Sequence, residues 1–194
     1  MKLGVLIPLH TPFVTAEWAL SIRRLRVPKN TLWSFYRGPL PIDKARTALV
    51  KDALENECTH VLFLDSDVIP EPDAVETLLK YRYPITSGLY PDKGGRSNTW
   101  VNRQNKWLEK GSMIVDEVGL GFCLIDTRVF KKVHPPWFVY LYNGGSEDAP
   151  SEDIFFCRLA KAFNFGVLVV GEVKCRHVGT FAMTSPDKCE HLRI

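Results

Sequence analysis

The sequence predicts a single α/β domain built around a mostly parallel central sheet flanked by helices. Short apolar segments alternate with segments of helical periodicity over the first 90 residues, which is typical of parallel strands joined by helical crossovers. Residues 61–64 are apolar throughout, as expected for a strand buried on both faces. With 194 residues, 45% of them hydrophobic, the chain is long enough for one full core.

The first half of the chain contains four predicted strands and three predicted helices. Thr15 is a capping residue that begins the first helix, Asp43 begins the second, and prolines flank the start of the third. The second helix carries apolar residues on one face. The expected strands are residues 2–8, 31–36, 61–64 and 84–89, and the expected helices are 15–27, 43–57 and 72–80.

The second half is less regular. Residues 90–110 mix polar and aromatic side chains, which indicates either a loop and hairpin over a site or a solvated β-meander. Two strand halves are expected on either side of a glycine-marked bend. Ser151 is expected to cap a helix. The further expected elements are strand halves 113–118 and 122–126, an aromatic edge strand 135–140, an acidic loop 143–148, a helix 152–160 and a core strand 165–170.

Asp65 and Asp67 directly follow the buried strand 61–64. Ligands of open α/β sheets bind at the carboxyl ends of strands, so these carboxylates are expected at the mouth of a crevice. Two unpaired carboxylates repel each other, and Mg²⁺ or Mn²⁺ removes that repulsion while leaving coordination sites for a diphosphate. The alternative is that Asp65 caps a turn and Asp67 is solvated.

Composition excludes several classes of partner. The net charge of +3, without a run of basic residues, argues against nucleic acid. No apolar segment reaches the length of a transmembrane segment, and the N-terminus reads as a first strand and not as a signal. Five cysteines without a C-x-x-C pair indicate a reducing, cytoplasmic compartment. An alternative for two C-x-H units, Cys175 with His177 and Cys189 with His191, is a zinc site.

Seven ordered motifs together resemble the GT-A glycosyltransferases, in particular the family 2 type, from Leu3 to about Gly179. They are a first strand ending in Ile7-Pro8, Ala45-Arg46, Asp65-Ser66-Asp67 followed by Pro70, Pro72 and Asp73, Gly119-Leu120-Gly121-Phe122, Pro136-Trp137-Phe138, Ser151-Glu152-Asp153, and His177-Val178-Gly179. The resemblance implies one Rossmann-like GT-A domain over residues 1–194. Residues 1–90 would be the nucleotide-binding half, 91–180 the acceptor-binding half with a smaller hairpin or sheet, and 181–194 a tail.

The resemblance implies transfer of a sugar from a nucleoside diphosphate sugar to an acceptor hydroxyl, with Mn²⁺ or Mg²⁺ as cofactor and a UDP-sugar favoured over a GDP-sugar. By the same resemblance Asp67 is a metal ligand, Asp65 contacts the ribose and the metal shell, and His177 completes the metal site. A fixed cation would stabilise the departing diphosphate. The alternative for His177 is an ordinary surface or core histidine.

Asp153 would be the general base of a single inverting displacement, with Glu152 as the second candidate. Alternatively, both acids serve only the start of their helix. Arg46 is expected near the base or phosphates. Trp137 would either stack on the acceptor sugar or pack in the core. The other residues expected to line the nucleotide are Pro8, Leu9, His10, Thr11, Ser66 and Gly121.

One departure from the family pattern concerns the base. Family 2 members commonly carry an Asp beyond the second strand, where this chain has Ser34 to Gly38. Three other functions compete with the inverting transferase: a retaining GT-A enzyme, a domain that binds sugar nucleotides without turnover, and a phosphatase of the haloacid dehalogenase type. Phosphatases of that type carry Thr or Val where this chain has Ile69, and their Asp-x-Asp motif follows the first strand, whereas here two strand–helix units precede it.

Overall fold

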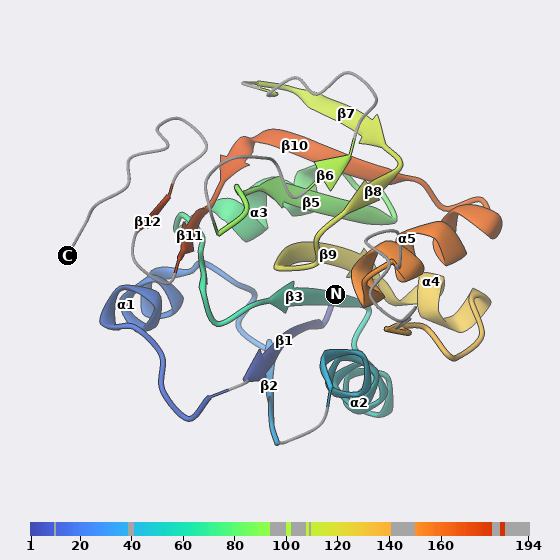
Figure 1. Cartoon of the computed structure of the whole chain (residues 1–194), viewed down its shortest axis with the longest axis horizontal. Helices are drawn as coiled ribbons and strands as arrows, with labels where there is room; N and C mark the ends of the chain where they lie inside the picture. The colour runs from blue at the N-terminus through green and yellow to red at the C-terminus, as the bar shows by residue number, and fades with distance from the viewer. Residues whose placement is uncertain are drawn as a thin grey trace.

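The computed structural model describes residues 1–9, 11–38, 41–93, 108, 110–140 and 150–179, and the backbone of 100–101 and 183–184. A seven-stranded sheet crosses the molecule, with helices on both faces (Figure 1). This confirms the predicted α/β class. None of the helices in these described ranges is long and apolar enough to cross a membrane.

The strand order of the large sheet is β2-β1-β3-β9-β5-β10-β7. The pairs β2/β1, β1/β3 and β5/β10 are parallel, whereas β9 runs antiparallel to both β3 and β5, and β7 runs antiparallel to β10. All strands except β9 and β7 therefore point the same way. The strands are β1 Leu3–Leu9, β2 Leu32–Arg37, β3 His60–Leu64, β5 Ile85–Leu89, β7 Ser112–Val115, β9 Phe122–Asp126 and β10 Val167–Lys174.

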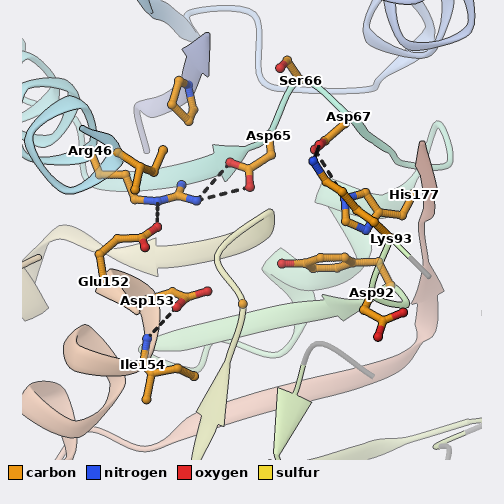
Figure 2. A pocket seen from close by; sticks show the side chains of 14 residues that line it. Arg46, Asp65, Ser66, Asp67, Asp92, Lys93, Glu152, Asp153, Ile154 and His177 are labelled. Atoms are coloured by element: carbon orange, nitrogen blue, oxygen red, sulfur yellow. Dashed lines mark hydrogen bonds and ion pairs between the residues drawn. The ribbon is translucent and has the colours of Figure 1, made fainter. Parts of the chain in front are cut away.

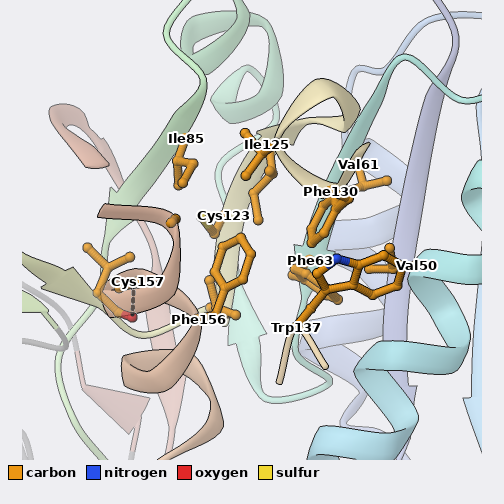
Figure 3. Close-up of a cluster of buried hydrophobic side chains, with 14 of the residues drawn as sticks. Val50, Val61, Phe63, Ile85, Cys123, Ile125, Phe130, Trp137, Phe156 and Cys157 are labelled. Atoms are coloured by element: carbon orange, nitrogen blue, oxygen red, sulfur yellow. Dashed lines mark hydrogen bonds between the residues drawn. The ribbon is translucent and has the colours of Figure 1, made fainter. Parts of the chain in front are cut away.

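Helices cover the two faces of this sheet. Alternation along β3 separates the two cores: Val61 and Phe63 belong to one cluster, and Leu62 and Leu64 to the other. The first cluster packs against α2, α4 and α5 (Figure 3), and the second against α1 and α3. The helices are α1 Ala16–Arg24, α2 Ile42–Glu55, α3 Ala74–Lys80, α4 Thr127–Lys132 and α5 Glu152–Ala162.

Two small sheets sit beside the large one. In the first, β4 (Val68–Ile69) pairs antiparallel with β11 (Arg176–Val178), which also pairs with β12 (Met183–Thr184). In the second, β6 (Trp100–Val101) pairs with β8 (Glu117–Val118). The β4/β11 pairing fastens the segment after β10 to the turn that follows β3. The β6/β8 sheet matches the smaller sheet predicted for the second half, whereas the β4/β11/β12 sheet joins strands from both halves of the chain.

The predicted edge strand at 135–140 is wrong, because these residues form no strand. Their aromatic side chains serve the core instead: Trp137 and Phe138 are 5% and 3% exposed. Trp137 packs edge-on against Phe130 (Figure 3), and its indole N–H donates to the carbonyl of Val133 at 2.5 Å. The four described cysteines are all free and buried, consistent with small apolar core residues.

Candidate active site

A cavity of about 500 Å³ opens at the carboxyl edge of the large sheet. Its walls come from the end of β1, the turns after β3 and β5, the residues before β9, and the start of α5 (Figure 2). Its volume is in the range of pockets that hold small ligands, and its position is where α/β sheets bind them. The lining residues are Pro8, Ile42, Arg46, Asp65, Ser66, Asp67, Tyr90, Asp92, Lys93, Gly119, Glu152, Asp153, Ile154 and His177.

Arg46 joins two of the predicted site carboxylates. Its Nη2 donates to both oxygens of Asp65, at 3.1 and 3.2 Å, and its Nε donates to Glu152 at 3.0 Å (Figure 2). The guanidinium lies 5.0 Å from the ring centroid of Phe63, and Arg46 is 3% exposed. Burial lowers the pKa of Arg46, but the two carboxylates raise it by more, so the charge is permanent.

This arrangement differs from the expectation that Arg46 lies near the base or phosphates. Arg46 borders the cavity, but two edges of its fork are occupied by Asp65 and Glu152. A planar guanidinium held by two carboxylates has little freedom to turn toward a phosphate. Arg46 therefore orients the two acids, and its network is the internal scaffold of the site.

Asp67 is brought to His177 by the β4/β11 pairing. Val68 lies opposite His177 in that register, and the N–H of Val178 donates to the carbonyl of Asp67 at 2.8 Å. The His177 Nε2 is 3.5 Å from Asp67 Oδ1, and the Lys93 ammonium is 2.6 Å from Asp67 Oδ2 (Figure 2). Burial raises the pKa of Asp67, but His177 and Lys93 outweigh it and lower that pKa to about 2.

Asp67 and His177 fit a shared divalent cation. The His177 Nδ1 is 2.8 Å from the carbonyl oxygen of Pro91, and because a carbonyl only accepts, Nδ1 carries the hydrogen. Nε2 then faces the carboxylate of Asp67 either as a second N–H, which would donate to it, or as a lone pair, which could bind a cation placed between the two groups. A ring nitrogen fixed by a carbonyl behind it is also how metal-binding histidines are held.

The predicted third ligand does not join this pair. The carboxylate of Asp65 is directed at Arg46, and the described parts of the chain contain no group of three His, Cys, Asp or Glu side chains arranged for a metal. A cation at Asp67 and His177 would thus take its remaining ligands from water or a bound phosphate, which is usual for Mg²⁺. In the zinc alternative, Cys189 and His191 lie outside the described residues, and His177 faces Asp67.

The two candidate bases have different surroundings. Glu152 is 6% exposed and bound to Arg46, and burial, opposed in part by Arg46, raises its pKa. Asp153 is half-buried and borders the cavity; its Oδ1 accepts from the Ile154 N–H at 2.8 Å and from the Ser151 hydroxyl. Ser151 occupies the N-cap position of α5 as predicted, but its side chain makes no cap bond.

The remaining predicted residues are divided between the cavity and its surroundings. Pro8 and Ser66 line it, whereas Leu9 and Thr11 do not, and His10 lies outside the described residues. Gly121 does not line the cavity, but its N–H donates at 2.7 Å to the hydroxyl of Tyr90, which does. Trp137 is 5% exposed in the core, so it presents no face to an acceptor sugar. The packing role left open by the sequence applies to it.

The sequence analysis left several cavity residues unnamed, although one of its two alternatives for residues 90–110 was a loop over a site. Tyr90, Asp92 and Lys93 directly follow β5, and the rule that pointed to the turn after β3 applies equally to the turn after β5. Gly119, which belongs to the motif Gly119-Leu120-Gly121-Phe122 noted in the sequence, also lines the cavity. Ile42 and Ile154 carry no chemical signal, because apolar residues at the start of a helix are common.

Comparisons with known proteins add to this geometry. No protein-family model and no curated protein matches the sequence. Among solved structures, the chain is similar to A197 from STIV with a TM-score of 0.74, 20% identity, and coverage of 100% of this chain and 98% of that one. At that identity the similarity concerns the fold alone.

Two further solved structures are informative. TarS 1–349 from S. aureus matches with a TM-score of 0.52 and 16% identity, over 89% of this chain and 58% of that one. GalNAc-T7, determined with UDP, GalNAc and Mn²⁺, matches with a TM-score of 0.54 and 13% identity, over 91% of this chain and 43% of that one. Both are glycosyltransferases of the GT-A type. The chain has a GT-A-like fold. It spans 58% of the length of TarS 1–349 and 43% of the length of GalNAc-T7.

Proposed function

We propose that this chain is a metal-dependent glycosyltransferase of the family 2 type. It would move a sugar from a nucleoside diphosphate sugar, with UDP favoured, to an acceptor hydroxyl. The observation that carries the proposal is the placement of the Asp67–His177 pair and the Asp153 carboxylate around one cavity at the carboxyl edge of a GT-A-like sheet. The Mn²⁺ and UDP of the GalNAc-T7 structure agree with this choice of cofactor and nucleotide.

Each acidic residue then has a separate task. Asp67 and His177 would hold the cation, which when bound supplies the positive charge that stabilises a departing diphosphate. Arg46 holds the carboxylates of Asp65 and Glu152 in fixed positions. Glu152 is thereby less suited to take a proton from an acceptor, because its Oε1 is bound to Arg46 and its side chain is buried.

Asp153 is left as the base. The Ile154 N–H and the Ser151 hydroxyl both bind its Oδ1, which fixes the carboxylate while it borders the cavity. Asp153 lies across the cavity from Asp67 (Figure 2), as an attack from the side opposite the diphosphate requires. A single displacement in this geometry inverts the anomeric carbon, and NMR of the product distinguishes it from a retaining reaction.

The competing phosphatase would use Asp65 as nucleophile. Both oxygens of Asp65 accept hydrogen bonds from Arg46, which stabilises the carboxylate and lowers its reactivity toward phosphorus. The surroundings of Asp65 therefore favour transfer of a sugar over hydrolysis of a phosphate.

Calorimetric titration of UDP, GDP, dTDP and CMP, each with Mn²⁺ and with chelator, tests the proposal. We expect UDP to bind only with Mn²⁺, and Asp67→Asn to lose this binding. Asp116→Asn is the matched control, because it removes the same charge from a surface pair with Lys161. Binding of UDP that is equal with chelator, or unchanged in Asp67→Asn, would refute the metal site.

The base assignment has its own test. Asp153→Asn should bind UDP and Mn²⁺ as the wild type does, but should lose transfer by a factor of about a hundred or more. Glu152→Gln serves as the comparison, since it alters the neighbouring acid in the same way. Normal transfer by Asp153→Asn would show that another group takes the proton.

A further inference from the structure

Each carboxylate of the Asp65-Ser66-Asp67 motif is paired with a side-chain cation. Arg46 binds Asp65 at 3.1 Å, and Lys93 binds Asp67 at 2.6 Å (Figure 2). The repulsion that would otherwise demand a divalent cation is therefore removed by the protein itself. The motif is neutralised before any metal arrives.

The two cations differ in how firmly they are held. The Arg46 side chain is 3% exposed, has Glu152 as a second carboxylate partner and lies over the ring of Phe63. The Lys93 side chain is 60% exposed. Its ammonium is a compact charge on a flexible stem of four carbons, which moves at little cost. Arg46 is thus a permanent part of the site, and Lys93 is replaceable.

Lys93 would compete with the predicted cation for the carboxylate of Asp67. Its ammonium occupies Oδ2 of Asp67, while His177 faces Oδ1. A divalent ion bound by Asp67 and His177 would be next to that ammonium, and like charges at such a distance repel strongly in a partly buried site. The backbone near Lys93 is held in place, because the carbonyl of Pro91 binds His177. Displacement would move the side chain and leave the segment where it is.

We propose that Lys93 is an exchangeable counter-ion: it neutralises Asp67 in the absence of metal, leaves when the divalent cation binds, and then pairs with the phosphates of the nucleotide. This rests on the proposed function, which brings a diphosphate into the cavity that Lys93 lines. Lysine is a common binder of phosphate. Lys93 therefore opposes the metal when the site is empty and supports the nucleotide when it is full.

The proposal predicts opposite effects of one substitution on two ligands. Lys93→Met removes the charge and keeps the length of the side chain. Without nucleotide it should bind Mn²⁺ about twofold to fivefold more tightly than the wild type, the range expected from losing a partly exposed ion pair as competitor. With saturating Mn²⁺ it should bind UDP more weakly by a similar factor. Free Mn²⁺ measured by electron paramagnetic resonance, and calorimetry with UDP, give the two affinities.

Lys29→Met is the matched control, because it removes the same charge from an exposed lysine in a turn away from the cavity. It should leave both affinities at the wild-type values. If Lys93→Met and Lys29→Met bind Mn²⁺ equally while UDP binding still requires Mn²⁺, the exchange is overturned. The proposed function then still stands. Failure of every protein to bind Mn²⁺ overturns both. Tighter Mn²⁺ with unchanged UDP affinity overturns the phosphate contact.

Discussion

Replacing Arg46 with Met should destabilise the fold strongly. The substitution leaves Glu152, 6% exposed, as a buried carboxylate without its cation, which typically costs about 3–5 kcal/mol. Asp65 adds less, because its side chain is 28% exposed and water can solvate it. Within the described residues, Arg46 Nη1 has no hydrogen-bond partner, and its removal returns about 1 kcal/mol. The expected net loss is about 3 kcal/mol, or about 6–12 °C in Tm for a domain of this size.

This loss should depend on pH in a defined direction. Burial already raises the pKa of Glu152, and Arg46 opposes that rise, so the variant should raise it further. A carboxyl whose folded pKa lies above its unfolded value contributes stability below the unfolded pKa and loses it as pH rises through the folded pKa. The difference between variant and wild type should therefore be small near pH 5 and larger at pH 7.5, as measured by urea unfolding at both values.

The double variant Arg46→Met with Glu152→Gln supplies the control. A neutral amide cannot ionise, so the double variant should recover part of the lost stability at pH 7.5, and its stability relative to the wild type should change little with pH. If Arg46→Met alone loses less than about 1 kcal/mol, or if Glu152→Gln restores nothing, the buried network does not stabilise the fold as argued.

Two further substitutions test the packing around the site. Gly88→Ala in β5 would place a Cβ 2.7 Å from Val173 Cγ1 and 3.1 Å from its carbonyl oxygen, so a loss of about 1–3 kcal/mol is expected in urea unfolding; an unchanged midpoint would mean that β10 yields easily. Tyr90→Phe would leave the buried Gly121 N–H without the hydroxyl that it now binds at 2.7 Å, costing about 1–3 kcal/mol, and calorimetric unfolding that matches the wild type would show that another acceptor replaces it.

The sequence predicted those parts of the fold whose signal is local. Thr15 was recognised as a cap, and its side chain does accept the Trp18 N–H. The apolar run before Asp65 predicted a buried central strand, and its residues are fully buried in both cores. In contrast, α4 has only six residues, too few for a helical period to show, and β4 has two. Such short elements are stabilised by the strands and core residues that they contact, and these contacts are not visible in the local sequence.

The site was predicted less completely, for the same reason. Asp65, Asp67 and Asp153 were found because they stand at the ends of recognisable elements. The partner of Arg46 could not be found, because Glu152 is 106 residues away in the sequence. The aromatic character of Trp137 was equally compatible with a sugar platform and with a core, and only its contacts with Phe130 and Val133 decide between them.

The proposed metal site depends on the pairing of β4 with β11, which joins an early and a late segment of the chain. Asp67 and His177 lie far apart in the sequence and are brought together by this pairing, because β11 follows closely on β10. The join is a short ladder, Arg176 with Ile69 and His177 with Val68, and short ladders open more readily than a core. Linkage then works in both directions: opening of β11 would release a bound cation, and a bound cation would hold β11 closed. The late segment of the chain would thus act as a clasp whose tightness is set by the ion that it helps to hold.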